Sequence, residues 1–100
     1  MLEQNIVTLS AAMTFHEAVD NTVLKALAKL VAAVRQEPGC LEYAAHVHAD
    51  DPRRVLFYER WQNQAALDVH SAAEPLTTFR ETMGPRIMGP SELNAWKRVN

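Results

Sequence analysis

Alternation of apolar and polar positions predicts a β-strand near the start of the chain. Within residues 5–13, apolar residues recur at every second position from Val7, namely Val7, Leu9, Ala11 and Met13. Thr8 and Ser10 are among the residues on the opposite side. A period of two residues is that of a strand with one face toward a core.

The next segment changes to the three- and four-residue spacing of an amphipathic helix. Thr14 followed by Glu17 fits a capping box, in which each side chain bonds to the backbone near the other, so we expect the helix to begin there. Its apolar face would comprise Val19, Val23, Leu27, Leu30, Val31 and Val34. The sequence "EPG" at 37–39 is expected to end it.

The second half of the chain repeats the pattern. Residues 40–48 alternate, "ADDPRR" supplies turn residues, and "VLFYERW" alternates again, which predicts an antiparallel hairpin. Asn63 is a candidate N-cap for a short helix through about His70. Pro75 suits the first turn of a further helix that Gly84 and Pro85 end, and "ELNAWKRV" predicts a last strand.

This order is the βαββαβ plan of a ferredoxin-like α+β fold, an antiparallel sheet with helices on one face, in a single domain over residues 1–100. The strands carry apolar residues on both faces, such as Phe57 on one side and Leu56 on the other. A sheet with one solvated face alternates more cleanly. We therefore expect a homodimer that packs through the two open sheet faces.

Composition excludes several classes of partner. The chain has 100 residues, 48% of them hydrophobic, and a net charge of −2, which disfavours nucleic acid because no basic stripe is present. Cys40 is the one cysteine, so neither an intrachain disulfide nor a zinc site of paired cysteines can form. No apolar run reaches membrane-spanning length and no basic leader opens the chain, so no membrane partner and a cytoplasmic location are expected.

Three segments resemble the antibiotic biosynthesis monooxygenase domain family: "EPGCLEY" at 37–43, "VLFYERWQNQAALDVH" at 55–70 and "FRETMGPRIMGP" at 79–90. The middle segment, an aromatic-Glu-x-Trp strand followed by a helix that ends in His, is the most specific. The resemblance implies a dimeric α/β barrel and a small monooxygenase that oxidises phenols or quinols with no cofactor, neither metal nor flavin. The same scaffold also hosts haem-degrading enzymes, isomerases and proteins without demonstrated activity, so it indicates architecture better than chemistry.

The haem-degrading branch of this family uses an Asn, a Trp in the second helical region and a His that ligates iron. In the present chain the segment 64–83 contains no Trp, and its one histidine is His70. This departure disfavours haem.

His70 is the candidate catalytic base. An oxygenase without a cofactor needs a base that works near neutral pH, an apolar pocket and donors for a developing oxyanion. On the predicted helix, His70 shares a face with Ala66 and Leu67 and should point toward the sheet. The alternative is an ordinary core histidine whose ring is satisfied by a backbone carbonyl or by Glu59.

Phe57, Glu59 and Trp61 share one face of the predicted third strand, by its period of two. Trp61 and Phe57 are candidate walls for a planar substrate, with the indole N–H as a donor, or else plain core residues. Glu59 lies between them and needs a buried partner, either His70, which it would orient, or Arg80.

Tyr43 and Phe79 are further candidate pocket walls, and the Tyr43 hydroxyl could donate a hydrogen bond to a substrate oxygen. For both residues the alternative is again simple core packing.

His46 and His48 form an H-x-H pair whose rings would lie on one face of a strand. Asp50 or Asp51 could add a ligand, but nothing further is spaced to complete a metal site, so none is expected. Cys40 is expected to be a small buried hydrophobe.

The leading hypothesis is a small dimeric monooxygenase that oxidises a phenolic or quinol-type molecule with dioxygen. One alternative is an isomerase or other proton-transfer enzyme acting on a small carbonyl metabolite. Another is a non-catalytic dimeric ligand-binding module. The alternation does not decide which sheet face carries the pocket and which the dimer interface.

Overall fold

The computed structural model describes residues 5–100. Its elements are β1 (Val7–Phe15), α1 (Asn21–Val34), β2 (Cys40–Val47), β3 (Arg54–Trp61), α2 (Gln64–Ala72), α3 (Glu74–Met83) and β4 (Ile87–Trp96). A single turn of 3-10 helix, Gly84–Arg86, joins α3 to β4. The first four residues of the domain predicted over 1–100 lie outside the described residues, and its bounds stay a prediction.

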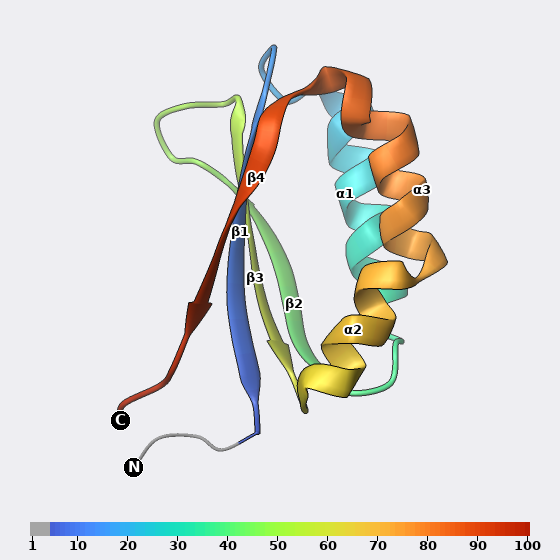
Figure 1. Cartoon of the computed structure of the whole chain (residues 1–100). Helices are drawn as coiled ribbons and strands as arrows, with labels where there is room; N and C mark the ends of the chain where they lie inside the picture. The colour runs from blue at the N-terminus through green and yellow to red at the C-terminus, as the bar shows by residue number, and fades with distance from the viewer. Residues whose placement is uncertain (1–4) are drawn as a thin grey trace.

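The four strands form one antiparallel sheet in the order β2-β3-β1-β4. Among the residues that the structure describes, the α-helices α1, α2 and α3 all lie on one face of this sheet, and the opposite face carries no helix (Figure 1). The predicted ferredoxin-like α+β fold is thereby confirmed. Within residues 5–100, no helix combines the length and the apolar character needed to cross a membrane.

Strand register decides which side chains face the helices. Phe57 of β3 pairs with Ala11 of β1 and with Ala45 of β2, and directly paired residues share a sheet face. Phe57 is buried beneath the helices, whereas Leu56, its neighbour in sequence, is exposed on the open face. The buried apolar residues of the core are Ala11, Phe15, Val23, Leu27, Leu30, Val34, Tyr43, Val55, Phe57, Trp61, Phe79 and Met83.

The capping box predicted at Thr14 is wrong. Thr14 lies inside β1 and pairs with Arg54, and the strand continues to Phe15. The Phe15 side chain is 1% exposed, and its amide donates to the carbonyl of Arg53 at 2.7 Å. Burying a phenylalanine stabilises a fold by about 1.5–3 kcal/mol, more than the roughly 1 kcal/mol of a helix cap, so the strand prevails.

The first helix instead begins at Asn21. The Asp20 side chain is its N-cap and accepts the amide of Val23 at 3.0 Å. Val19, predicted for the apolar face of this helix, lies before it and donates its amide to the carbonyl of Pro52 at 2.8 Å.

The remaining boundary signals are mostly confirmed. Asn63 caps α2 by accepting the amide of Ala66 at 2.9 Å, Pro75 lies in the first turn of α3, and Gly84 is its C-cap. The last strand begins at Ile87, earlier than predicted, because Phe15 at the extended end of β1 provides its pairing partner.

Candidate functional site

The candidate site forms between the helices and the end of β3 that adjoins α2. Six predicted residues meet there, and all six are buried: Tyr43, Phe57, Glu59, Trp61, His70 and Phe79. Tyr43 of β2 pairs with Glu59 of β3, which places both on the helix face. Alternation did not decide which sheet face carries Phe57, Glu59 and Trp61. The structure shows that these three residues of β3 face the helices.

Aromatic contacts surround the ring of His70, whose residue is 2% exposed. The imidazole stacks on the Trp61 ring, with centroids 4.5 Å apart, and meets the Tyr43 ring edge-on at 5.5 Å. Phe57 packs against Tyr43 at 5.5 Å and against Phe79 edge-to-face at 6.2 Å. His70 thus lies in an aromatic cage.

Two carboxylates flank His70 on opposite ring nitrogens. Glu37 Oε1 lies 2.9 Å from Nδ1, a hydrogen bond, while Glu59 Oε1 lies 3.9 Å from Nε2, which is beyond hydrogen-bonding reach. Glu59 instead accepts the indole N–H of Trp61 at 2.8 Å. The orienting contact expected from Glu59 therefore comes from Glu37, and Arg80, the other expected partner of Glu59, is exposed on α3.

Glu37 is the site residue that sequence reasoning missed, because "EPG" indicated only the end of a helix. Gly39 in that turn has φ +82°, and a Cβ there would lie 2.6 Å from Cβ of Ala66 in α2. The turn therefore packs against α2 at a distance that only glycine permits. This close approach brings Glu37 to His70, which no local pattern in the sequence indicates.

Burial governs the electrostatics of the cluster. It raises the pKa of the Glu59 carboxyl, against the opposing effects of the Trp61 hydrogen bond and of His70. Burial, together with the two nearby carboxylates, also raises the pKa of Tyr43 far above that of a free phenol. Tyr43 is therefore a neutral hydrogen-bond donor at physiological pH. The pKa of the half-buried Cys40 thiol is raised as well, which makes it a poor nucleophile.

A cavity of about 290 Å³ lies between α1 and α3, and Phe79 is among the residues that line it. Leu30 and Ala33 line it from α1, and Pro75 and Thr78 from α3. Its volume is close to the lower end of the range of ligand pockets. Phe79 is the wall that this cavity shares with the aromatic cage.

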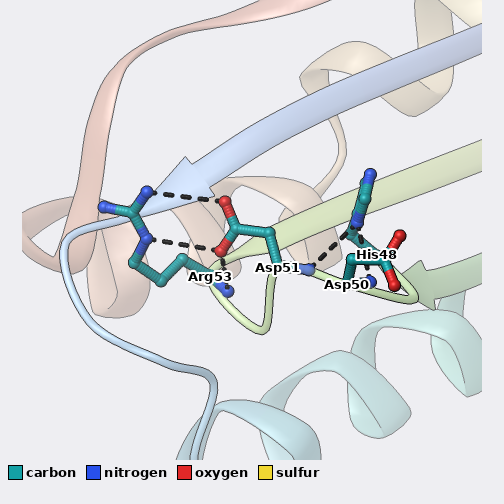
Figure 2. A network of polar contacts seen from close by, with 4 residues as sticks. All are labelled: His48, Asp50, Asp51 and Arg53. Carbon is teal, nitrogen blue, oxygen red and sulfur yellow. Dashed lines mark hydrogen bonds and ion pairs between the residues drawn. The ribbon is translucent and has the colours of Figure 1, made fainter.

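The H-x-H pair lies at the far end of the sheet, in and beside the β2–β3 loop. His48 Nδ1 accepts the amides of both Asp50 and Asp51 at 3.0 Å, and Asp51 binds Arg53 (Figure 2). His46 makes a long contact, 3.4 Å, to the carbonyl of Leu56. Across the described part of the chain, no three His, Cys, Asp or Glu side chains gather as a metal site would require.

Comparison with known proteins gives a family match and several similar structures. The family model "antibiotic biosynthesis monooxygenase" matches residues 6–82. A crystal structure of an antibiotic biosynthesis monooxygenase is 29% identical, with 100% of both chains covered and a TM-score of 0.85. A Pseudomonas aeruginosa protein is 26% identical over 97% of each chain, with a TM-score of 0.86. A Shewanella oneidensis protein is 26% identical over 98% of this chain and 95% of its own, with a TM-score of 0.84.

One curated relative is more similar in sequence over a shorter stretch. It is an uncharacterized protein of Synechocystis sp., 33% identical over 63 residues. The match covers 63% of this chain and spans 43% of that relative's length.

Proposed function

This chain belongs to the antibiotic biosynthesis monooxygenase family, and on that premise we propose a cofactor-independent monooxygenase that oxidises a phenolic or quinol-type molecule with dioxygen. Family membership supports a monooxygenase-like activity on a small molecule. The observation that carries the finer proposal is the His70 imidazole, held between two carboxylates inside a cage of aromatic rings.

The chemistry requires deprotonation of the substrate first, because a phenolate gives up an electron to dioxygen far more readily than a phenol. His70 takes the phenolic proton. Dioxygen then bonds to a ring carbon, the O–O bond breaks, and that carbon keeps one oxygen as a carbonyl. The other oxygen leaves as water with two hydrogens from the substrate, one of them returned by His70. Phenol and dioxygen thus give quinone and water without an external reductant.

The aromatic rings would bind the planar substrate and exclude water. Trp61, Phe57 and Tyr43 are its walls, and the neutral Tyr43 hydroxyl donates to a substrate oxygen. Access is through the cavity between α1 and α3, because rotation of the Phe79 side chain would join it to the cage. Glu59 would counter positive charge on His70 after proton transfer.

Oxygen uptake with a panel of hydroquinones and polycyclic phenols tests the proposal. We expect His70→Ala to lower turnover by about 10²–10⁴-fold, the usual contribution of a general base. His48→Ala, a histidine change at the other end of the sheet, should leave turnover unchanged. Absence of oxygen uptake with every substrate, or full activity of His70→Ala, would overturn it. Hydroquinone binding without turnover, followed by NMR shifts of residues around the cavity, would indicate the ligand-binding module instead.

A second candidate function is proton transfer without oxygen, such as isomerisation of a small carbonyl metabolite. The observation in its favour is that the carboxylate-flanked imidazole can move a proton whether or not dioxygen is present. Turnover that persists under argon and is lost in His70→Ala would favour this function over the monooxygenase.

We also propose that the chain is a homodimer through the open sheet face. That face exposes large apolar side chains, with Leu56 40% and Trp96 56% exposed. Sedimentation of the wild type should show a dimer at micromolar concentration, and Leu56→Asp should dissociate it. The matched control is Leu24→Asp, which changes a similarly exposed leucine on α1. A monomeric wild type would contradict this proposal.

A further inference from the structure

We infer that Glu37 is the positioning residue of the proposed base: it holds His70 as the Nδ1–H tautomer and leaves Nε2 as the nitrogen that exchanges protons. The inference rests on the proposed function, since it concerns the same histidine. A carboxylate can only accept hydrogen bonds, so the ring nitrogen 2.9 Å from Glu37 Oε1 must be the donor.

The Glu37 carboxylate depends on His70 for its hydrogen bonding. Its Oε2 atom is buried and has no hydrogen-bond partner among residues 5–100, and Oε1 bonds to His70. A buried carboxylate without a donor is costly, so this pair strongly favours the state in which Nδ1 carries the proton. Loss of the Nδ1–H donor would remove the hydrogen bond that Oε1 accepts and leave a second oxygen of this carboxylate without its protein partner.

The backbone that carries Glu37 is held on both sides. The Glu37 amide donates to the carbonyl of Val34 at 2.9 Å, and the Cys40 amide donates to the carbonyl of Glu37 at 3.2 Å. Gly39 accepts the amide of Gln62 at 2.8 Å, which ties the turn to the end of β3. Backbone hydrogen bonds on both sides of the turn therefore restrict where the carboxylate can lie, as a group that positions a catalytic ring requires.

The second carboxylate leaves Nε2 free for chemistry. Glu59 Oε1 lies 3.9 Å from Nε2 and already accepts the indole N–H of Trp61. Within the described chain no hydrogen bond reaches Nε2, while the stacked Trp61 ring holds the imidazole plane. The two flanking carboxylates are therefore not equivalent, because Glu37 orients the ring and Glu59 supplies only nearby charge.

Ring ¹⁵N chemical shifts of His70, measured by long-range ¹H–¹⁵N NMR on the neutral ring, test the tautomer directly. We expect Nδ1–H in the wild type. Glu37→Gln should keep it, because the amide oxygen can still accept. Glu37→Leu should shift the population toward Nε2–H, because Glu59 is then the remaining acceptor. Finding the Nε2–H tautomer of His70 in the wild type would overturn the inference without any variant. An unchanged tautomer population in Glu37→Leu would overturn it as well.

Kinetics separate positioning from a structural role. With a hydroquinone that the wild type oxidises, Glu37→Leu should lower kcat by about 10²–10⁴-fold, as a misplaced imidazole tautomer does, and change KM less than about threefold. Glu37→Gln should recover most of kcat. Equal loss in both variants would overturn the positioning role. If the wild type oxidises nothing, the proposed function fails, while the NMR experiment still decides whether Glu37 sets the tautomer.

Discussion

Two histidines at opposite ends of β3 have almost opposite surroundings. His70, beside the end at Trp61, is buried, stacked on that ring, and donates from Nδ1 to a carboxylate. His48, in the loop before Arg54, is exposed, and its Nδ1 accepts two backbone amides at 3.0 Å (Figure 2). The same ring atom is therefore a donor in one region and an acceptor in the other.

Exposure to solvent determines how much each set of polar contacts contributes to stability. The loop around His48 is open to water, and its ion pair between Asp51 and Arg53, 3.3 Å long, is of the exposed kind that contributes little. The Glu37 side chain is only 13% exposed, and the His70 imidazole donates the hydrogen bond that its Oε1 atom accepts. The hydrogen-bond partner of His70, Glu37, lies 33 residues away along the chain, whereas Asp50 and Asp51 are within three residues of His48.

The largest difference in stability between the two regions should appear when each histidine is replaced by alanine. His70→Ala should lower the free energy of unfolding by about 3–5 kcal/mol, because the largely buried Glu37 carboxylate loses the donor that its Oε1 atom accepts from. His48→Ala should cost only about 0.5–1 kcal/mol, because water replaces the two exposed hydrogen bonds. Urea unfolding followed by tryptophan fluorescence measures both, and equal costs for the two variants would contradict the comparison.

The next effect comes from the turn that brings Glu37 to His70. At Gly39 the backbone has a positive φ of +82°, and an added Cβ would lie 2.6 Å from Cβ of Ala66. We therefore expect Gly39→Ala to lower the free energy of unfolding by about 2–5 kcal/mol. Gly89→Ala has a positive φ of +63° but open space, and should cost only about 1–2 kcal/mol. Thermal unfolding of the two variants separates the close approach from backbone strain.

Gly84→Ala is the neutral control, since its Cβ would meet nothing within 4 Å and its φ is −49°. It should change stability by less than about 1 kcal/mol. If Gly39→Ala were no worse than Gly89→Ala, the packing of the turn on α2 would not be what holds Glu37 in place.

The same contrast explains what the sequence could predict. Asn63, Pro75 and Gly84 act through their own neighbours, so local rules found them. The capping box predicted at Thr14 was wrong because the burial of Phe15 extends the strand, and no local sequence pattern measures that burial. Glu37 was missed because its partner His70 is 33 residues away, and the connection depends on a glycine that fits closely against another helix. Alternation correctly grouped Phe57, Glu59 and Trp61, but only strand register and helix placement showed which face they share with His70.

The smallest expected effect is the pH dependence of stability caused by the carboxyl groups of Glu59 and Asp51. It should have opposite signs at the two ends of β3. Burial raises the pKa of Glu59, so its contribution to stability is present below pH 4.5 and is lost as pH rises through the raised value. The Arg53 amide and side chain lower the pKa of Asp51, so its contribution is present above pH 3.8 and is lost as pH falls through the lowered value.

The isosteric amides should therefore respond in opposite directions. Relative to the wild type, Glu59→Gln should become more stable as pH rises from about 4 to 7, by on the order of 1 kcal/mol, because it keeps an acceptor for Trp61 without a buried charge. Asp51→Asn should become less stable relative to the wild type as pH rises from about 2 to 4, because the wild type gains the carboxylate that Arg53 favours. Urea midpoints across this range measure both slopes. If stability relative to the wild type changed with pH in the same direction for both variants, the charge of His70 rather than burial would control the pKa of Glu59. The contrast between the buried and the exposed end of β3 would then be contradicted.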